Sequence, residues 1–199
     1  MRFFTTLFFA FLITTSSFSQ SQKETIEKEA QTYYDYMTNM NLDGVLDYMH
    51  PKMFDMAPKE QMKAGMEQMF NSPQMKIEFI SNTITSISDT KELDEVTYAV
   101  VYFNSKMRMT FLTEKDKPEE QRTDYLELMK STMAVQFGSE NVTIDAETTS
   151  LVINNDANMF AIKDSQYDGW KFLSNEKNMA AFVNSIVPEA VRTALLEKE

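Results

Sequence analysis

The sequence predicts an α+β fold in which N-terminal helices pack on a strongly bent antiparallel sheet. Apolar residues recur at helical spacing over residues 21–70 and alternate at strand spacing from residue 75 to about residue 112. Turn residues then separate further short strands, and helices grouped before neighbouring strands are typical of α+β proteins with antiparallel sheets. A chain of 199 residues, 43% of them hydrophobic, suits a single domain.

Residues 1–19 have the layout of a cleaved signal peptide. A positive charge at Arg2 precedes a short apolar run broken only by two threonines, and small residues then stand before a cut at Gln20. The run is shorter than the about 20 residues that a membrane helix needs, so no membrane span is predicted. A buried N-terminal strand or a retained anchor is the alternative. We therefore expect an exported chain, periplasmic or secreted, whose domain covers residues 20–199.

Three helices are predicted before the sheet. Over residues 21–40, apolar side chains follow one another at spacings of three and four, and no Gly or Pro interrupts them. A short second helix ends at His50-Pro51, because a residue before proline disfavours helical backbone. A third helix begins near Pro58, whose missing N–H suits the first helical position.

Two long strands are predicted next. Residues 75–88 alternate, and the apolar phase slips between Phe79 and Ile80, which indicates a bulge that bends the strand. Residues 91–95 form a polar connection. Residues 95–112 are apolar on both faces near their middle, as expected of a strand in a sheet that helices cover.

The rest of the chain alternates helix and strand. A helix over residues 124–137 is inserted between strands and ends at Gly138. Further strands are predicted over residues 142–153, 159–163 and 169–173. The polar residues 154–156 are expected to form a turn between the first two of these strands. A helical extension, residues 176–199, closes the chain and is divided at Pro188.

The composition excludes several classes of function. A net charge of −11 and a pI near 4.6 argue against a nucleic-acid partner, which needs a basic face. The absence of Cys excludes thiol nucleophiles and thiolate metal sites. The single His excludes multi-histidine metal sites, and four Gly without a phosphate-loop pattern leave no nucleotide fingerprint. No cofactor and no metal are predicted.

Methionine is concentrated between Met49 and Met75. Met62, Met66 and Met69 recur at helical spacing, which is typical of a packed core face. Met residues also line adaptable surfaces that bind ligands or partners. In an exported chain, thioethers near His50 would in addition suit Cu(I). The three interpretations stay open at this point.

Two stretches carry a resemblance to a known superfamily. The first, residues 46–54, reads Leu-Asp-Tyr-Met-His-Pro-Lys-Met-Phe, and the second, residues 167–172, reads Tyr-Asp-Gly-Trp-Lys-Phe. Together with the order of elements over residues 22–175, they resemble the nuclear transport factor 2-like superfamily, whose helices close an antiparallel sheet into a cone. The helix at 124–137 and the extension at 176–199 depart from that pattern.

The resemblance implies a pocket inside the cone. The residues expected to line it are Tyr33, Tyr36, Tyr98, Tyr102, Met62, Met66 and Trp170. In enzymes of the superfamily, a buried carboxylate or His works with Tyr donors, and Glu78, Asp145 and Glu147 are the acids expected in strands here. Burial would raise the pKa of such a carboxylate towards neutrality. No catalytic motif matches residue by residue. His50 is expected to end a helix and to contact free carbonyls.

Three functional hypotheses follow. The first is a non-enzymatic exported domain that binds a small apolar ligand in the cone, or a protein partner or second copy through the sheet face. That face needs cover because Val100 and Val101 point in opposite directions. The second is an isomerase, dehydratase or cyclase that uses a buried acid with Tyr98 or Tyr102. The third is a methionine-based copper carrier.

Overall fold

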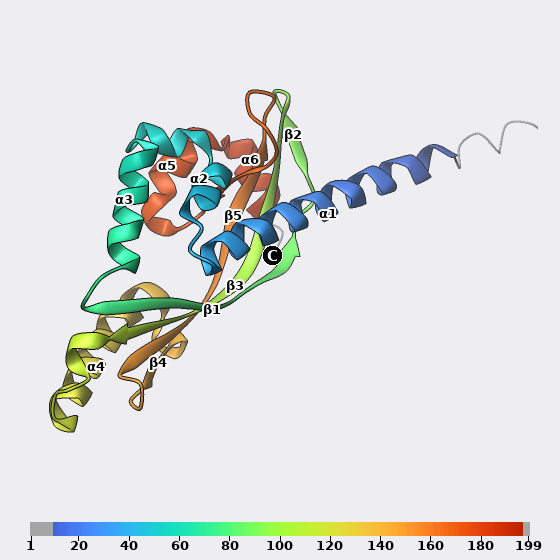
Figure 1. The fold of residues 1–199 in the computed structure, drawn as a ribbon. Coiled ribbons are helices and arrows are strands. Elements are labelled where there is room, and N and C mark those ends of the chain that lie inside the picture. The colour runs from blue at the N-terminus through green and yellow to red at the C-terminus, as the bar shows by residue number, and fades with distance from the viewer. Residues whose placement is uncertain (1–9, 197–199) are drawn as a thin grey trace, which may run out of the picture.

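The computed structural model describes residues 10–196, with side chains from residue 20 onward, and over this range it has an α+β fold (Figure 1). Its helices are α1 (Ala10–Thr38), α2 (Leu42–Tyr48), α3 (Lys59–Phe70), α4 (Glu119–Phe137), α5 (Ala180–Ile186) and α6 (Glu189–Leu196). Its strands are β1 (Met75–Ile87), β2 (Lys91–Leu93), β3 (Val96–Phe111), β4 (Val142–Asp145), β5 (Ser150–Lys163) and β6 (Lys171–Ser174). Short 3₁₀ turns are η1 (Pro51–Asp55), η2 (Leu112–Glu114), η3 (Ser139–Asn141) and η4 (Lys177–Met179).

The six strands form one antiparallel sheet that does not close on itself. The order is β1-β3-β5-β4, with β2 beside β3 and β6 beside β5. β3 and β5 pair in one unbroken register from Thr97 opposite Lys163 to Thr110 opposite Ser150. β1 pairs with β3 less regularly, with register shifts between Phe79 and Ser81 and again later in the strand. The first shift confirms the predicted bulge, which increases the local twist of the strand.

One face of the sheet packs against α1. Side chains from α1, from odd-numbered positions of β3 and β5, and from the turn into β6 form this cluster: Ile26, Ala30, Tyr34, Ala99, Val101, Met159, Ala161, Trp170 and Phe172. The first turns of α1 project beyond the sheet (Figure 1). Further along the same face, α4 covers the other end of β3 and β5 through Leu126, which is buried against Phe111, Leu151 and Ile153.

The opposite face packs against the C-terminal helices. Even-numbered residues of β3 and β5 meet Val183 and Val187 of the α5 segment and Val191 and Leu195 of α6. The face that carries Val100 is therefore covered by helices of the same chain. The need to cover this face no longer supports a second copy on it. This cluster reaches Tyr102 on β3. Beyond Tyr102 the same face carries polar residues, among them the exposed Lys106.

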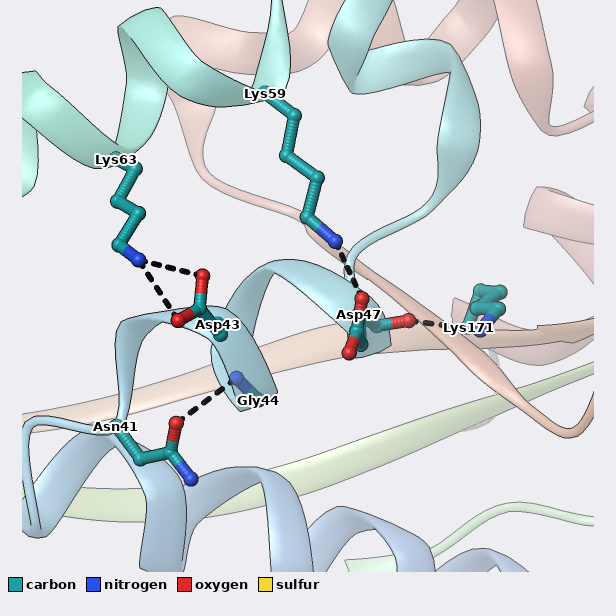
Figure 2. Close-up of polar contacts among 7 residues, drawn as sticks. All are labelled: Asn41, Asp43, Gly44, Asp47, Lys59, Lys63 and Lys171. Carbon is teal, nitrogen blue, oxygen red and sulfur yellow. Dashed lines mark hydrogen bonds and ion pairs between the residues drawn. The ribbon is translucent and has the colours of Figure 1, made fainter.

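Two ion pairs attach α3 to α2. None of its residues is buried, but two of its lysines reach two aspartates of α2 (Figure 2). Lys63 Nζ contacts both Asp43 carboxylate oxygens at 2.7 Å, and Lys59 pairs with Asp47 one helical turn along. This hydrogen bond with Asp43 raises the pKa of Lys63. The two ion pairs lie one helical turn apart, because the two lysines stand four residues apart on α3 and the two aspartates stand four residues apart on α2.

The α2 segment is in turn held to the sheet. Asn41 caps α2 by accepting a hydrogen bond from the Gly44 N–H at 3.1 Å, and Lys171 of β6 donates to the Asp47 carbonyl at 2.7 Å (Figure 2). Met49 makes a parallel bridge to Phe172, and the His50 N–H donates to the Phe172 carbonyl at 2.9 Å. α3 is thus connected to the sheet through α2 and through Phe70 at its end, whose ring lies edge-on to that of Phe79 on β1 at 6.1 Å.

Most predicted elements are confirmed, and three predictions at strands were wrong. Residues 142–153 are a hairpin, because the chain turns at 146–149, where Thr149 has a φ of 55°. The predicted turn at 154–156 lies in the middle of β5, where pairing with β3 keeps the backbone extended. The connection at 91–95 contains the short strand β2, which continues the edge occupied by β1.

The predicted signal peptide lies partly outside the described residues. Residues 1–9 are not described, and residues 10–19 are the first turns of α1, which continues past Gln20 to Thr38. Within residues 10–196, no helix combines the length and the apolar character needed to cross a membrane.

Replacing Asp43 and Asp47 together by Asn tests the ionic attachment of α3. The substitutions remove both charges and keep the side-chain shape, so we expect amide hydrogen exchange over α3 to become several-fold faster while that of β3 is unchanged. High salt should have the same effect on the unaltered chain, since exposed ion pairs are screened. Lys76→Gln, which removes the exposed pair with Glu78 on β1, is the control. Unchanged exchange in α3 would show that packing holds it.

Candidate functional site

The residues predicted to line one pocket lie on different faces of the sheet. Tyr33 and Trp170 belong to the cluster under α1, and the Tyr36 ring lies against Tyr48. Tyr98 and Tyr102 share a face, as predicted, but it is the opposite face, under α5 and α6. Met62 and Met66 are half-buried on α3. The described structure therefore does not bring the seven residues into one pocket.

The space between α1 and the sheet is filled by aromatic side chains. Tyr33 packs against Tyr34 and Phe172, with ring centroids 5.4 and 5.5 Å apart, and Tyr34 packs against Phe103 at 5.0 Å. The Tyr34 hydroxyl donates to the sulfur of Met159 at 3.7 Å. Burial raises the pKa of Tyr33 to about 12 and that of Tyr34 further. Both hydroxyls stay protonated at neutral pH and are used in packing.

The acids expected to act with the tyrosines lie elsewhere. Glu78 pairs with Lys76 at 2.7 Å, and Asp145 contacts Arg108 at 3.4 Å. Hydrogen bonds from Thr148 lower the pKa of Asp145. Asp145 is paired with the first residue of β5, whereas Tyr98 lies opposite Ile162, near the end of that strand. Glu147 is exposed in the turn after β4. This arrangement offers no acid beside Tyr98 or Tyr102 from these three positions.

His50 is buried, with 7% of its surface exposed, and caps a helix N-terminus. Its Nδ1 accepts a hydrogen bond from the Lys52 N–H at 3.3 Å, at the start of η1. The expected contact with free carbonyls at a helix end is wrong, because α2 already ends at Tyr48 and Pro51 starts a new turn. Burial lowers the pKa of His50 to about 4, so the ring is neutral at pH 7. Tyr167 packs edge-on against it at 5.7 Å.

The methionines between Met49 and Met75 do not converge. Met53 packs against the cluster under α5 and α6, whereas Met75 packs against the cluster under α4. Met62 and Met66 are half-buried, and Met69 is 44% exposed, so the stripe on α3 is only partly packed. These positions do not form a shared set of thioether ligands in the described structure.

Clefts on the described residues are open to solvent and lined by both polar and apolar groups. One of about 690 Å³ runs between α1, α2 and the turn before β6. Its polar groups already hold the fold together: Glu29 accepts from the Trp170 N–H at 2.9 Å, and Lys171 binds the Asp47 carbonyl. A smaller cleft of about 230 Å³ lies beside Tyr102 and Leu195.

A third cleft, of about 650 Å³, lies on the edge of β5, and we call it the β5 cleft. Its volume is in the range usual for small-molecule sites. Three segments meet there, the end of α4 with η3, the middle of β5, and the chain after β6. The residues that line it are Val135, Gln136, Phe137, Asn141, Asn155, Asp156, Ala157, Asn158, Asn175, Glu176, Lys177 and Asn178.

The floor of the β5 cleft is an unpaired stretch of strand edge. β4 pairs with β5 up to Ile153, and β6 pairs from Met159 onward, so neither strand covers residues 154–157. The Val152 carbonyl accepts a hydrogen bond from Thr143, and the Asn158 carbonyl accepts one from the Asn175 N–H. Backbone groups alternate in direction along a strand, so those of the two even-numbered residues between Val152 and Asn158 also point to this edge.

Several polar side chains of the β5 cleft are held in place. Asn175 Nδ2 donates to Asn158 Oδ1 at 2.8 Å, and Asn141 Nδ2 donates to the Phe137 carbonyl at 2.8 Å. Asp156 Oδ1 accepts from Asn104 at 2.8 Å. The sequence holds a signal for this site, since five of the twelve Asn line it. The turn-like composition of residues 154–156 hides this signal, because it predicts a turn where the structure has a strand.

No protein-family model, no curated protein and no solved structure matches the chain.

The burial of His50 predicts loss of stability in acid. The neutral form is favoured in the folded state, so protonation favours unfolding, and stability is lost as pH falls from about 6.5 through about 4. The loss is expected to be up to about 3 kcal/mol. His50→Asn keeps an acceptor for the Lys52 N–H and removes the titration. Urea unfolding between pH 7 and pH 4 should therefore show a flatter pH dependence for the variant. Equal slopes would refute the assignment to His50.

Proposed function

We propose that this chain is a non-enzymatic domain that binds a small polar ligand in the β5 cleft. The observation that carries the proposal is the meeting of three separate chain segments around an unpaired strand edge, with their amides already oriented. The space under α1, where an apolar ligand was expected, is occupied by aromatic side chains. We therefore propose binding at the sheet edge instead of inside the cone, and a polar ligand instead of an apolar one.

Membership of the nuclear transport factor 2-like superfamily remains part of this proposal. It is supported by the order of elements, by α1 lying across one face of the sheet, and by the bridge that joins Met49 to Phe172 after α2. The open sheet and the helix α4 between β3 and β4 depart from the expected cone. Export is supported by the sequence of residues 1–19 alone.

The enzyme and copper alternatives have less support. An isomerase or dehydratase needs an acid near Tyr98 or Tyr102, and the three expected acids are placed elsewhere. The acids whose charges act on Tyr98 are Asp94 and Asp164, which follow β2 and β5 in the chain. Copper binding needs thioethers that converge, and those of the Met49–Met75 segment pack into different clusters. A protein partner remains an expectation, with the polar part of the sheet face beyond Tyr102 as its place.

Filling the β5 cleft tests the proposal. Asn178 is an exposed lining residue after β6, and Asn178→Trp would occupy the cleft without disturbing a buried side chain. Small polar solutes that raise the melting temperature of the unaltered chain should have little effect on this variant. A ligand at a hundred times its Kd stabilises the folded state by about 2.7 kcal/mol, which thermal unfolding resolves.

The matched control is Asn184→Trp, at an exposed Asn of α5 that lines none of the described clefts. It should respond to the solutes as the unaltered chain does. Equal stabilisation of both tryptophan variants would place binding outside the β5 cleft, and no stabilisation of the unaltered chain by any solute would refute small-ligand binding.

A further inference from the structure

We infer that the ligand class of the β5 cleft is a neutral saccharide or related polyol, an inference that rests on the proposed function. Six of the twelve lining residues carry a side-chain amide. An amide offers both a donor and an acceptor, and a hydroxyl group also acts as both. Neighbouring hydroxyls of a sugar can therefore pair with one amide through both of its ends.

The fixed amides leave their free ends available to a ligand. In the Asn175–Asn158 pair, the contact uses Asn175 Nδ2 and Asn158 Oδ1, which leaves Asn158 Nδ2 as a donor and Asn175 Oδ1 as an acceptor. The Asn141 contact with Phe137 likewise leaves Asn141 Oδ1 as an acceptor. Orientation by such contacts lowers the entropy that the side chains lose when a ligand binds.

The charges around the cleft disfavour an anionic ligand. The lining residues include two carboxylates, Asp156 and Glu176, and one cation, Lys177. An anionic ligand would meet two carboxylates and the field of a chain with a net charge of −11. A cationic ligand would be attracted by the same field and by the two carboxylates, but it would meet Lys177 and would share Asp156 with Asn104. The six side-chain amides outnumber the three charged groups of the lining, and a neutral hydroxylated ligand can use the amides without a charged partner.

Two apolar side chains at the end of α4 also line the cleft. Val135 is 90% exposed, and Phe137 packs against the cluster under that helix. An apolar side chain so exposed gains nothing within the fold, but it can pack on the C–H face of a sugar ring.

The length of the free edge argues against an extended peptide as the occupant. Residues 154–157 span about 13 Å at strand rise. At one end η3 leads into β4, and at the other β6 leads into η4, so the chain closes both ends of the edge. The edge groups of Asn154 and Asp156 can therefore contact a short ligand but cannot pair with a long strand.

A titration followed through side-chain amides tests the inference. The full chain is labelled with ¹⁵N, and maltose, cellobiose and sorbitol are added separately while the Asn and Gln side-chain signals are recorded. We expect at least one of the three to cause saturable shifts of lining amides, those of Asn155, Asn158 and Asn178 among them. Asn155→Ala combined with Asn178→Ala should weaken binding about tenfold through the loss of ligand hydrogen bonds. The control Asn184→Ala should bind as the unaltered chain does.

Charge removal gives a second, independent measurement. Glu176→Gln and Lys177→Gln should each leave saccharide affinity within about twofold, since a neutral ligand makes little use of the charges. A large loss in either variant would overturn the neutral-ligand assignment. Saccharide binding that is insensitive to Asn155 and Asn178 would overturn the site.

Glycine, succinate and putrescine serve as comparison probes. If one of these shifts the lining amides while the saccharides do not, the saccharide inference fails and the proposed polar-ligand function stands. If none of the six probes shifts these amides, both fail.

Discussion

The pairing of β3 with β5 is the constraint on which the rest of the structure depends. The two strands keep one register from end to end, so their side chains alternate without interruption between the two faces. Odd positions then supply the surface that α1 and α4 cover, and even positions supply the surface under α5 and α6. The same register keeps Asn154 to Asn158 extended, although their composition is typical of a turn. Without β3 as a full-length partner, this segment would not form the floor of a cleft.

Local signals predicted those parts of the fold that local sequence decides. The bulge after Phe79 follows from a slip in the apolar phase, and the break between α5 and α6 follows from Pro188. The segment from Asn154 to Asp156 could not be assigned in this way, because its turn propensity is overridden by hydrogen bonds to a strand some fifty residues earlier. Strand propensity depends on context more than helix propensity does, and β5 is an example.

The candidate site was less predictable than the fold, for a physical reason. Alternation showed that Tyr98 and Tyr102 share a face, but it could not show which helices cover that face. The sequence pattern therefore predicts one pocket for Tyr33 and for Tyr98 and Tyr102, which lie on opposite faces of the sheet. The β5 cleft joins residues from α4, β5 and the chain after β6, and no periodicity relates these segments. Only the abundance of Asn late in the sequence points towards it.

The interruption between β4 and β6 also bears on solubility. An unpaired strand edge is a template on which another copy of the chain can add a strand, and long flat edges promote aggregation. Here the free edge of β5 is short and recessed between two strands of the same chain, and the outer edge of β1 is broken by two register shifts. Both of these edges are thus poor templates for an added strand, because one is short and the other is irregular, and the β5 edge can still offer backbone hydrogen bonds to a small solute.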